Sequence, residues 1–278
     1  GNVSKYAKQA KVVHIEIDRA EINKIIPATV AVHADAKEAL TALITKCDSN
    51  QYPEWIGSFH KMKDIEFEKV IKHEFNPTGE LMMAEVIHHL SEMTNGEAII
   101  VTDVGQHQMT TSRYYEYKNP RTNVTSGGAG TMGFALPAAI GAKLGMPVKQ
   151  VIAVIGDGGY QMTVQELGTI MQYKIPVKIL VLNNNFLGMV RQWQQLFHEK
   201  RYSFTEMSNP NFVKLAEAYD IPARKVEKRE DLKAALKEML DAETSFFLEA
   251  VVGKEDNVFP MVPAGAGVAE VILEIPKK

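Results

Sequence analysis

The stretch VIAVIGDGG, residues 151–159, decides the fold. Residues 151–155 are an unbroken apolar run, which is typical of a strand covered on both faces in a parallel sheet. The glycines that follow let the backbone turn and approach a bulky anion closely. Asp157 stands at the end of the strand, where its carboxylate can reach a hard divalent cation. The stretch therefore predicts an α/β fold with a ligand site beyond a strand end.

Strands and helices alternate on both sides of this stretch. We expect further strands at residues 98–102, 177–182 and 246–252, and helices at residues 79–93, 131–146 and 163–173. Such alternation predicts right-handed βαβ units and a parallel sheet flanked by helices. The polar segments 103–107, 156–159 and 183–185 would then meet at the carboxyl edge of that sheet.

The beginning of the chain has a different pattern. Strands are expected at residues 12–17 and 29–32, and a helix at residues 35–43, which is too little for an independent core. We interpret residues 1–46 as the end of a second α/β domain whose earlier part precedes this sequence. Residues 47–76 are expected to be a linker that contains helix, and residues 77–278 the main domain.

The composition is that of an ordinary globular protein, with 45% hydrophobic and 23% charged residues. A net charge of −3 argues against a nucleic-acid surface. No apolar run approaches the roughly 20 residues that cross a bilayer. The only cysteine, Cys47, excludes an intrachain disulfide and fits a reducing compartment. We therefore expect a cytoplasmic protein that binds neither nucleic acid nor membrane.

A metal site is predicted from the joint occurrence of two motifs. Gly-Asp-Gly alone is a common turn, and the Asn183-Asn184 pair alone is ordinary turn chemistry. Together they are specific, because Asn184 falls at the end of the next expected strand, one helix after Asp157. A carboxylate, an amide oxygen, a backbone carbonyl, diphosphate oxygens and water would form an octahedral Mg²⁺ shell. The N–H groups of the glycine turn would complete the diphosphate site.

This combination is the shared signature of thiamine-diphosphate enzymes, and the rest of the chain resembles one of their families. Over essentially its whole length the chain resembles the C-terminal part of the acetolactate synthase catalytic subunit. The segments that carry the resemblance are residues 104–109, 130–142, 181–184, 187–190, 192–193 and 259–263. On this basis residues 1–46 correspond to the end of that family's central, FAD-associated domain, and residues 77–278 to its diphosphate-binding domain.

The resemblance implies roles for individual residues. Asp157, Asn184 and the backbone carbonyl of Phe186 are expected to bind Mg²⁺; the family often has another residue type at position 186, which a carbonyl ligand tolerates. The residues expected around thiamine diphosphate are Gln106, His107, Gly158 and Gly159 at the diphosphate, Gly130 and Met132 at the aminopyrimidine, and Gly188 and Met189 over the cofactor. Trp193 is expected to line the substrate channel. Gln108, Met109, Gly127 and Gly128 would contact a structural FAD, together with Asp18 and Asp35-Ala36 from the first unit.

The resemblance also implies an activity. Acetolactate synthases condense two 2-ketoacids, pyruvate with pyruvate or 2-ketobutyrate, and release CO₂ in branched-chain amino-acid biosynthesis. They act as homodimers or tetramers, and the resemblance leaves room for a small regulatory subunit. The family's activating glutamate belongs to the N-terminal domain of the other subunit. We therefore expect no catalytic residue and no turnover in this chain alone, and Glu166 should not be given that role.

Other functions remain open at this point. One is another thiamine-diphosphate enzyme, of the pyruvate oxidase or 2-ketoacid decarboxylase type, although Gln192-Trp193 and Met261-Val262-Pro263 favour acetolactate synthase. Another is a non-catalytic domain that keeps the fold, although the intact pair of Asp157 and Asn184 argues against it. Residues 128–133 also match G-x-G-x-x-G, the nicotinamide-cofactor motif. Residues 121–126 are a poor strand, however, and no acid lies at the required place.

Overall fold

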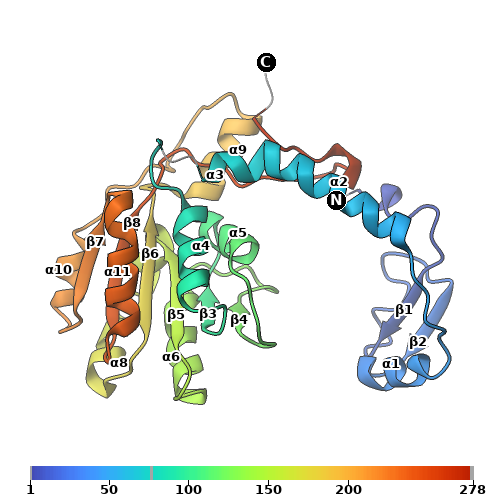
Figure 1. Cartoon of the computed structure of the whole chain (residues 1–278), viewed down its shortest axis with the longest axis horizontal. Helices are drawn as coiled ribbons and strands as arrows, with labels where there is room; N and C mark the ends of the chain where they lie inside the picture. Colours follow the sequence, from blue (N-terminus) through green and yellow to red (C-terminus); the bar gives the residue numbers. More distant parts are fainter. Residues whose placement is uncertain (1, 76–77, 276–278) are drawn as a thin grey trace. The chain divides into compact units, whose positions relative to one another are not determined.

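The computed structural model describes residues 2–75 and 78–275 (Figure 1). Contacts divide the chain into two compact units. The larger unit runs from Lys72 to Val258, and the smaller one combines residues up to Ile71 with residues from Phe259 on. The predicted domain limits at residues 46 and 77 stay a prediction, and the limit at residues 76–77 lies outside the described residues. Among the described residues, no helix has the length and apolar character needed to cross a bilayer.

Within its described residues, the larger unit contains a six-stranded parallel sheet in the order β4-β3-β5-β6-β8-β7. The strands are β3 (Ile99–Thr102), β4 (Asn123–Thr125), β5 (Val151–Gly156), β6 (Lys178–Asn183), β7 (Ala223–Val226) and β8 (Phe246–Val251). The neighbouring strands β5 and β6 lie in the middle, and residues 151–155 and 178–183 are buried throughout. The unbroken apolar run at residues 151–155 is therefore explained by cover on both faces.

Helices cover both faces of the sheet, as Figure 1 shows. Ile152 and Val154 of β5 join a core with α4 (Met83–Met93) and α11 (Arg229–Asp241). Val151, Ala153 and Ile155 face the other way and join a second core with α6 (Ala135–Gly145), α8 (Glu166–Tyr173) and α10 (Phe212–Glu217). This alternation is the period of two that a strand imposes on its side chains. The predicted parallel sheet flanked by helices is confirmed.

Four further helices are α3 (Lys72–Glu74), α5 (Gln106–Tyr114), α7 (Asp157–Met162) and α9 (Gly188–Phe197). Of these, α5 follows β3, α7 follows β5 and α9 follows β6, so each begins beyond the carboxyl end of a central strand. Gly-Asp-Gly is not an open turn: Asp157 is already the first residue of α7, and the helix expected from residue 163 begins at Glu166. The diphosphate motif therefore presents the N–H groups of a helical first turn.

Two strands differ from expectation. Residues 121–126 were expected to be a poor strand, but Asn123–Thr125 form β4 against β3. Residues 223–226 form β7, which the sequence pattern did not indicate. Both are edge strands, so each is held by one neighbour and needs little apolar burial. The nicotinamide alternative gains nothing from β4, because β3 lies between β4 and β5 and the two are not adjacent.

The smaller unit contains β1 (Val13–Glu16) paired in parallel with β2 (Val30–His33), followed by α1 (Ala36–Ile44). The helix α2 (Pro53–Glu66) continues into a π-helical turn, Phe67–Ile71, so the expected linker does contain helix. Short 3₁₀ turns lie at Val3–Lys5 and Val268–Glu270. The strands β1 and β2 and the helices α1 and α2 bury no residue fully. This agrees with the expectation that so few elements cannot form a core of their own.

Candidate functional site

A cavity of about 160 Å³ lies beyond the carboxyl ends of β3, β5 and β6. Ten of the residues predicted for the cofactor or metal line it: Gln106, His107, Met132, Asp157, Gly158, Gly159, Asn184, Phe186, Gly188 and Met189. These residues come from three separate strand-to-helix connections and one loop. The fold therefore brings the two halves of the predicted metal motif, after β5 and after β6, to one cavity.

Asp157 supplies the only carboxylate among the described residues of this lining. Its side chain is 1% exposed, and burial raises its pKa, partly offset by a hydrogen bond from Asn209. Asn209 Nδ2 donates to Asp157 Oδ2 at 2.7 Å, and no ion pair to Lys or Arg is found for Asp157 in the described residues. A buried carboxylate that forms no ion pair with Lys or Arg among the described residues is a suitable ligand for a divalent cation.

Asn184 and Gln106 orient each other at the cavity wall. Asn184 Nδ2 donates to Gln106 Oε1 at 3.3 Å, and Asn184 Oδ1 accepts from the backbone N–H of Phe186 at 3.1 Å. Gln106 Nε2 donates to Gln192 Oε1 and to the carbonyl of Asp256, both at 2.8 Å. The Gln106 amide nitrogen therefore donates both of its hydrogens to Gln192 and Asp256. The Gln106 amide oxygen remains to accept the hydrogen bond from Asn184. The predicted ligand Asn184 is held by a chain of amides.

Two glycines at the cavity cannot be replaced without moving functional side chains. A Cβ at Gly188 would lie 2.1 Å from Gln106 Oε1, and a Cβ at Gly158 would lie 2.8 Å from Leu187 Cδ2. Neither glycine has a left-handed φ, so the reason is close approach rather than backbone conformation. The close contacts are with neighbouring side chains, so the approach of these glycines to a diphosphate stays a prediction.

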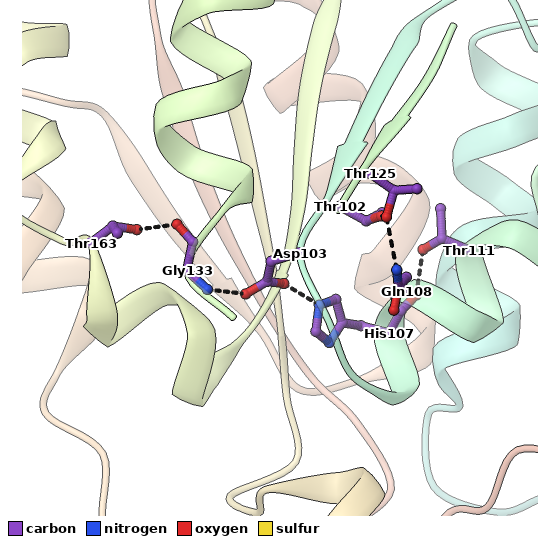
Figure 2. A network of polar contacts seen from close by, with 8 residues as sticks. All are labelled: Thr102, Asp103, His107, Gln108, Thr111, Thr125, Gly133 and Thr163. Carbon is purple, nitrogen blue, oxygen red and sulfur yellow. Dashed lines mark hydrogen bonds and ion pairs between the residues drawn. The ribbon is translucent and has the colours of Figure 1, made fainter. Parts of the chain in front are cut away.

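Asp103, the residue directly after β3, connects several parts of the site (Figure 2). One carboxylate oxygen accepts from His107 Nε2, and the other accepts from the Gly133 N–H at 2.9 Å. Its side chain is fully buried. The His107 ring lies against Gly156, where a Cβ would be 2.8 Å from Nδ1. Residue 103 falls in a polar segment predicted at the sheet edge, but the sequence indicates no role for it.

Asn209 is a second residue beside the predicted site that the sequence did not indicate. Besides Asp157, its Nδ2 lies 3.0 Å from Asn183 Oδ1 and 3.1 Å from Asn185 Oδ1, and its Oδ1 accepts from Gln161 at 2.9 Å. Glu206 pairs with Phe186 in a short antiparallel bridge, which brings the loop after α9, including Asn209, close to Asp157. The Asn209-Pro210 pair indicates only a turn, so nothing local in the sequence marks the residue.

The other predicted residues are placed as follows. Gly130, with φ of 65°, and Trp193, 37% exposed and packed on Phe197, are not among the described residues that line the cavity. Gln108 donates to Thr125 at 2.8 Å, Met109 is exposed, and Gly127 and Gly128 lie in an exposed turn after β4. Asp18 and Asp35 belong to the smaller unit, where they accept the N–H groups of Ala20 and Lys37. Ala36 begins α1.

Behind Gln106 lie two carboxyl groups with perturbed acidity. Burial, together with the neighbouring Asp256 carboxylate, raises the pKa of Glu74 to about 8, although Arg113 acts in the opposite direction. Burial also raises the pKa of Asp256 to about 6. The Asp256 carbonyl accepts from Gln106. The pair therefore adjoins the cavity without lining it.

The pair predicts how stability depends on pH. The folded pKa of Glu74 lies above its usual value of 4.5, so the folded state disfavours its charged form. The loss of folding stability caused by the charged Glu74 carboxylate is therefore absent below about pH 4.5 and grows until about pH 8. A rise in pKa from 4.5 to about 8 corresponds to roughly 4 kcal/mol at pH 8, so we expect Glu74→Gln to raise the free energy of unfolding there by up to about 4 kcal/mol and to change it little at pH 4.5. Thermal melts of both proteins between pH 4.5 and pH 8 test this expectation. Glu217→Gln, at an exposed position, is the control. Equal effects of Glu74→Gln at both pH values would contradict the expectation.

The fold and the site define an α/β protein with a buried carboxylate, amide side chains and glycines around a cavity at the carboxyl ends of parallel strands. The described residues contain no group of three or more His, Cys, Asp or Glu that could hold a metal, so a cation here would rely on the mixed set of Asp157, Asn184 and a carbonyl. The profile of the family described as "Thiamine pyrophosphate enzyme, C-terminal TPP binding domain" matches residues 103–250. The chain therefore belongs to the thiamine pyrophosphate (thiamine diphosphate) enzymes.

Comparison with individual proteins shows that the chain is similar to acetolactate synthases. The chain is 44% identical over 279 residues to the acetolactate synthase large subunit of Lactococcus lactis, covering 98% of this chain and 47% of the relative. It is 42% identical to acetolactate synthase 1, chloroplastic, of Nicotiana tabacum, covering 99% and 43%. It is 40% identical to the mitochondrial acetolactate synthase catalytic subunit of Saccharomyces cerevisiae, covering 98% and 41%. The resemblance inferred from the sequence is confirmed, and the chain spans a little less than half the length of these relatives.

Proposed function

We propose that this chain is the part of an acetolactate synthase catalytic subunit that anchors thiamine diphosphate through Mg²⁺. The observation that carries the proposal is the cavity where Asp157, Asn184 and Phe186 meet the glycines of α7. The similarity to three acetolactate synthases supports the same assignment. The substrates would be 2-ketoacids, pyruvate with pyruvate or 2-ketobutyrate, in branched-chain amino-acid biosynthesis.

The cavity residues fit the group that they would hold. Asp157 is a buried carboxylate without an ion pair among the described residues, and Mg²⁺ would supply the missing counter-charge. Asn184 Oδ1 and the Phe186 carbonyl would be the neutral oxygen ligands. Gly158 and Gly159 lie in the first turn of α7, where backbone N–H groups have no acceptor within the helix. These groups, with His107 and the backbone N–H of Gln106 at the first position of α5, would hold the diphosphate.

The apolar part of the lining would hold the rest of the cofactor. Met132, Leu187, Met189 and Val190 line the same cavity as Asp157. Met132 and Gly130 would contact the aminopyrimidine, Gly188 and Met189 would lie over the cofactor, and Trp193 would line the approach for substrate. When bound, thiamine diphosphate supplies the electron sink that lets a 2-ketoacid lose CO₂ and join a second one. The chain's own task is to orient the cofactor and exclude water.

A further carboxyl group is needed to exchange a proton with the cofactor's pyrimidine ring. Asp157 is the only carboxylate among the described lining residues, and the proposal assigns it to the metal. We therefore expect the 278-residue chain alone to bind the cofactor without turning over pyruvate, and a second subunit of a homodimer or tetramer to supply the group. Glu166, in the first turn of α8, is not a lining residue of the described cavity.

The remaining assignments extend the same proposal. A structural FAD would contact Gln108, Met109, Gly127 and Gly128, together with Asp18 and Asp35. A small regulatory subunit would be a further partner, and no nucleic acid would be bound. A reducing compartment such as the cytoplasm suits a chain whose cysteine, Cys47, is exposed and unpaired.

The activity is tested on the full-length gene product with pyruvate, thiamine diphosphate, Mg²⁺ and FAD. We expect acetolactate as the product. Acetaldehyde alone would identify a 2-ketoacid decarboxylase, and an oxygen- or phosphate-dependent oxidation of pyruvate would identify a pyruvate oxidase. Either result would overturn the proposed reaction while leaving the cofactor site intact. Absence of cofactor binding would instead favour a non-catalytic domain that has kept the fold.

Asn209 gives a test of the metal site that does not depend on turnover. Its hydrogen bond orients the Asp157 carboxylate, and loss of such an orienting partner typically costs about 10- to 100-fold in metal affinity. We expect Asn209→Ala to weaken Mg²⁺-dependent cofactor binding, measured by calorimetry, within that range. Asn119→Ala, at an exposed position of the same unit, is the matched control. Unchanged binding in Asn209→Ala would show that Asp157 needs no orientation from this loop.

A further inference from the structure

We propose that Asp103 is a positioning residue that fixes the His107 ring and ties the diphosphate end of the cavity to the segment before α6. The inference rests on the proposed function, because it concerns how this chain would hold thiamine diphosphate. Asp103 contacts neither of the predicted metal ligands Asp157 and Asn184 in any hydrogen bond found among the described residues. Its role would be exerted through its neighbours.

The geometry places Asp103 between two segments that are distant in sequence. Figure 2 shows its carboxylate between His107, at the beginning of α5, and Gly133, just before α6. Outer hydrogen bonds hold both partners: Thr111 Oγ1 donates to the His107 carbonyl at 2.6 Å, and Thr163 Oγ1 donates to the Gly133 carbonyl at 2.9 Å. The backbone on each side of Asp103 is thus restrained independently.

Asp103 is also confined from a third direction. A Cβ at Gly159 would lie 1.9 Å from Asp103 Oδ2, so the backbone of α7 approaches the carboxylate closely. Gly159 and His107 both line the cavity, and so does Met132, the residue before Gly133. A displacement of Asp103 would therefore move three parts of the cavity wall at once, namely Gly159, His107 and Met132.

The two hydrogen bonds require a carboxylate at position 103. The Gly133 N–H can only donate, so the oxygen facing it must accept. An ionised carboxylate accepts at both oxygens and so satisfies both contacts. An asparagine would offer one acceptor oxygen and one NH₂ group. If the asparagine NH₂ group faced Gly133, two donors would meet there. If the NH₂ group faced His107, the ring would lose its hydrogen-bond acceptor.

A carboxylate at this place selects where the His107 ring carries hydrogen. Nε2 faces Asp103 and must donate, so it carries hydrogen. Nδ1 is the nitrogen next to Gly105 and Gly156, where Cβ atoms would lie 2.9 and 2.8 Å from it, and both glycines line the cavity. The position of Nδ1 beside these two cavity-lining glycines is therefore set by Asp103, as a carboxylate orients a metal-binding histidine elsewhere.

The first test needs no variant at Asp103. Two-bond ¹H–¹⁵N correlation spectra of the ¹⁵N-histidine-labelled protein report which ring nitrogens carry hydrogen, and His107→Gln assigns the His107 signals. We expect hydrogen on Nε2 of His107. Hydrogen on Nδ1 alone would overturn the proposal, whatever the effect of substitutions.

The second test is a double-mutant cycle with two probes, inorganic diphosphate and thiamine diphosphate, each titrated with Mg²⁺ by calorimetry. Asp103→Asn is expected to weaken binding of both by about 10- to 100-fold. In the His107→Gln background it should change the affinity for inorganic diphosphate by less than about 3-fold, because its effect on that probe passes through His107. In the same background, Asp103→Asn should still weaken binding of thiamine diphosphate. This cofactor would also contact Met132, which is next to Gly133, the second hydrogen-bond partner of Asp103.

The outcomes separate the inference from the proposed function. If the wild-type protein does not bind thiamine diphosphate with Mg²⁺, the proposed function fails. If it binds, but Asp103→Asn binds equally well or its effect simply adds to that of His107→Gln for inorganic diphosphate, only the role of Asp103 fails. Asp220→Asn, a replacement at an exposed turn with φ of 55° that asparagine tolerates, is the control with unchanged binding.

Discussion

Replacing Asp157 with asparagine is expected to raise the melting temperature of the ligand-free protein and to weaken Mg²⁺-dependent binding of thiamine diphosphate by at least about 100-fold. The two effects have one cause. Burial raises the pKa of the Asp157 carboxyl, so its charge destabilises the ligand-free fold above its usual titration range. The neutral amide removes that penalty, but it also removes the counter-charge that a divalent cation needs.

The sign of the stability effect can be checked against pH. The folded pKa lies above the usual value of 3.8, so the penalty is present at neutral pH and absent once the carboxyl is protonated in both states. The gain in melting temperature should therefore be found at pH 7 and disappear in acid. Asp220→Asn removes an equal charge from an exposed turn and should change neither quantity. A variant at Asp157 that keeps full Mg²⁺-dependent affinity would remove this residue from the metal ligands.

Gly159→Ala is expected to destabilise the protein by about 2–4 kcal/mol. The new Cβ would lie 1.9 Å from Asp103 Oδ2, and that carboxylate is buried and held by His107 and Gly133. Neither partner can yield without breaking a buried hydrogen bond, so the backbone of α7 must move instead. Urea unfolding of the ligand-free protein measures the loss.

Gly141→Ala is the matched control for this substitution. Gly141 lies in the exposed part of α6, and nothing would come within 4 Å of its Cβ. The same change should there stabilise the protein by about 0.5–1 kcal/mol, because alanine costs less conformational entropy in a helix than glycine. Opposite signs are expected for the two substitutions. Equal effects would show that the approach to Asp103 is not what requires glycine at position 159.

The central part of the fold was predictable because its signals are local. The run at residues 151–155 indicates a strand covered on both faces, and the structure buries it completely. The glycines and Asp157 follow that strand directly, so a site at its carboxyl end could be inferred. The edge strands β4 and β7 could not, because each is held by one neighbour far away in the sequence. Their own residues carry little apolar pattern.

The supporting residues of the site could not be predicted for a related reason. Asn209 reaches Asp157 only because the loop after α9 returns along Phe186, and no local pattern announces that contact. Asp103 could have been found from the coincidence of a carboxylate at one strand end with a histidine one helical turn later. Trp193 stays a prediction, since the described cavity does not include it. Its place would depend on a substrate channel that the cavity residues alone do not define.

The central claim is that Asp157, Asn184 and Phe186 hold a metal that anchors thiamine diphosphate to this chain. Its most direct test is a calorimetric titration of thiamine diphosphate into the protein with Mg²⁺, repeated with the metal removed by EDTA. We expect saturable binding with Mg²⁺ and affinity at least about 100-fold lower without it, because the buried carboxylate then repels the diphosphate. Equal affinity in both titrations, or no binding when Mg²⁺ is present, would contradict the claim.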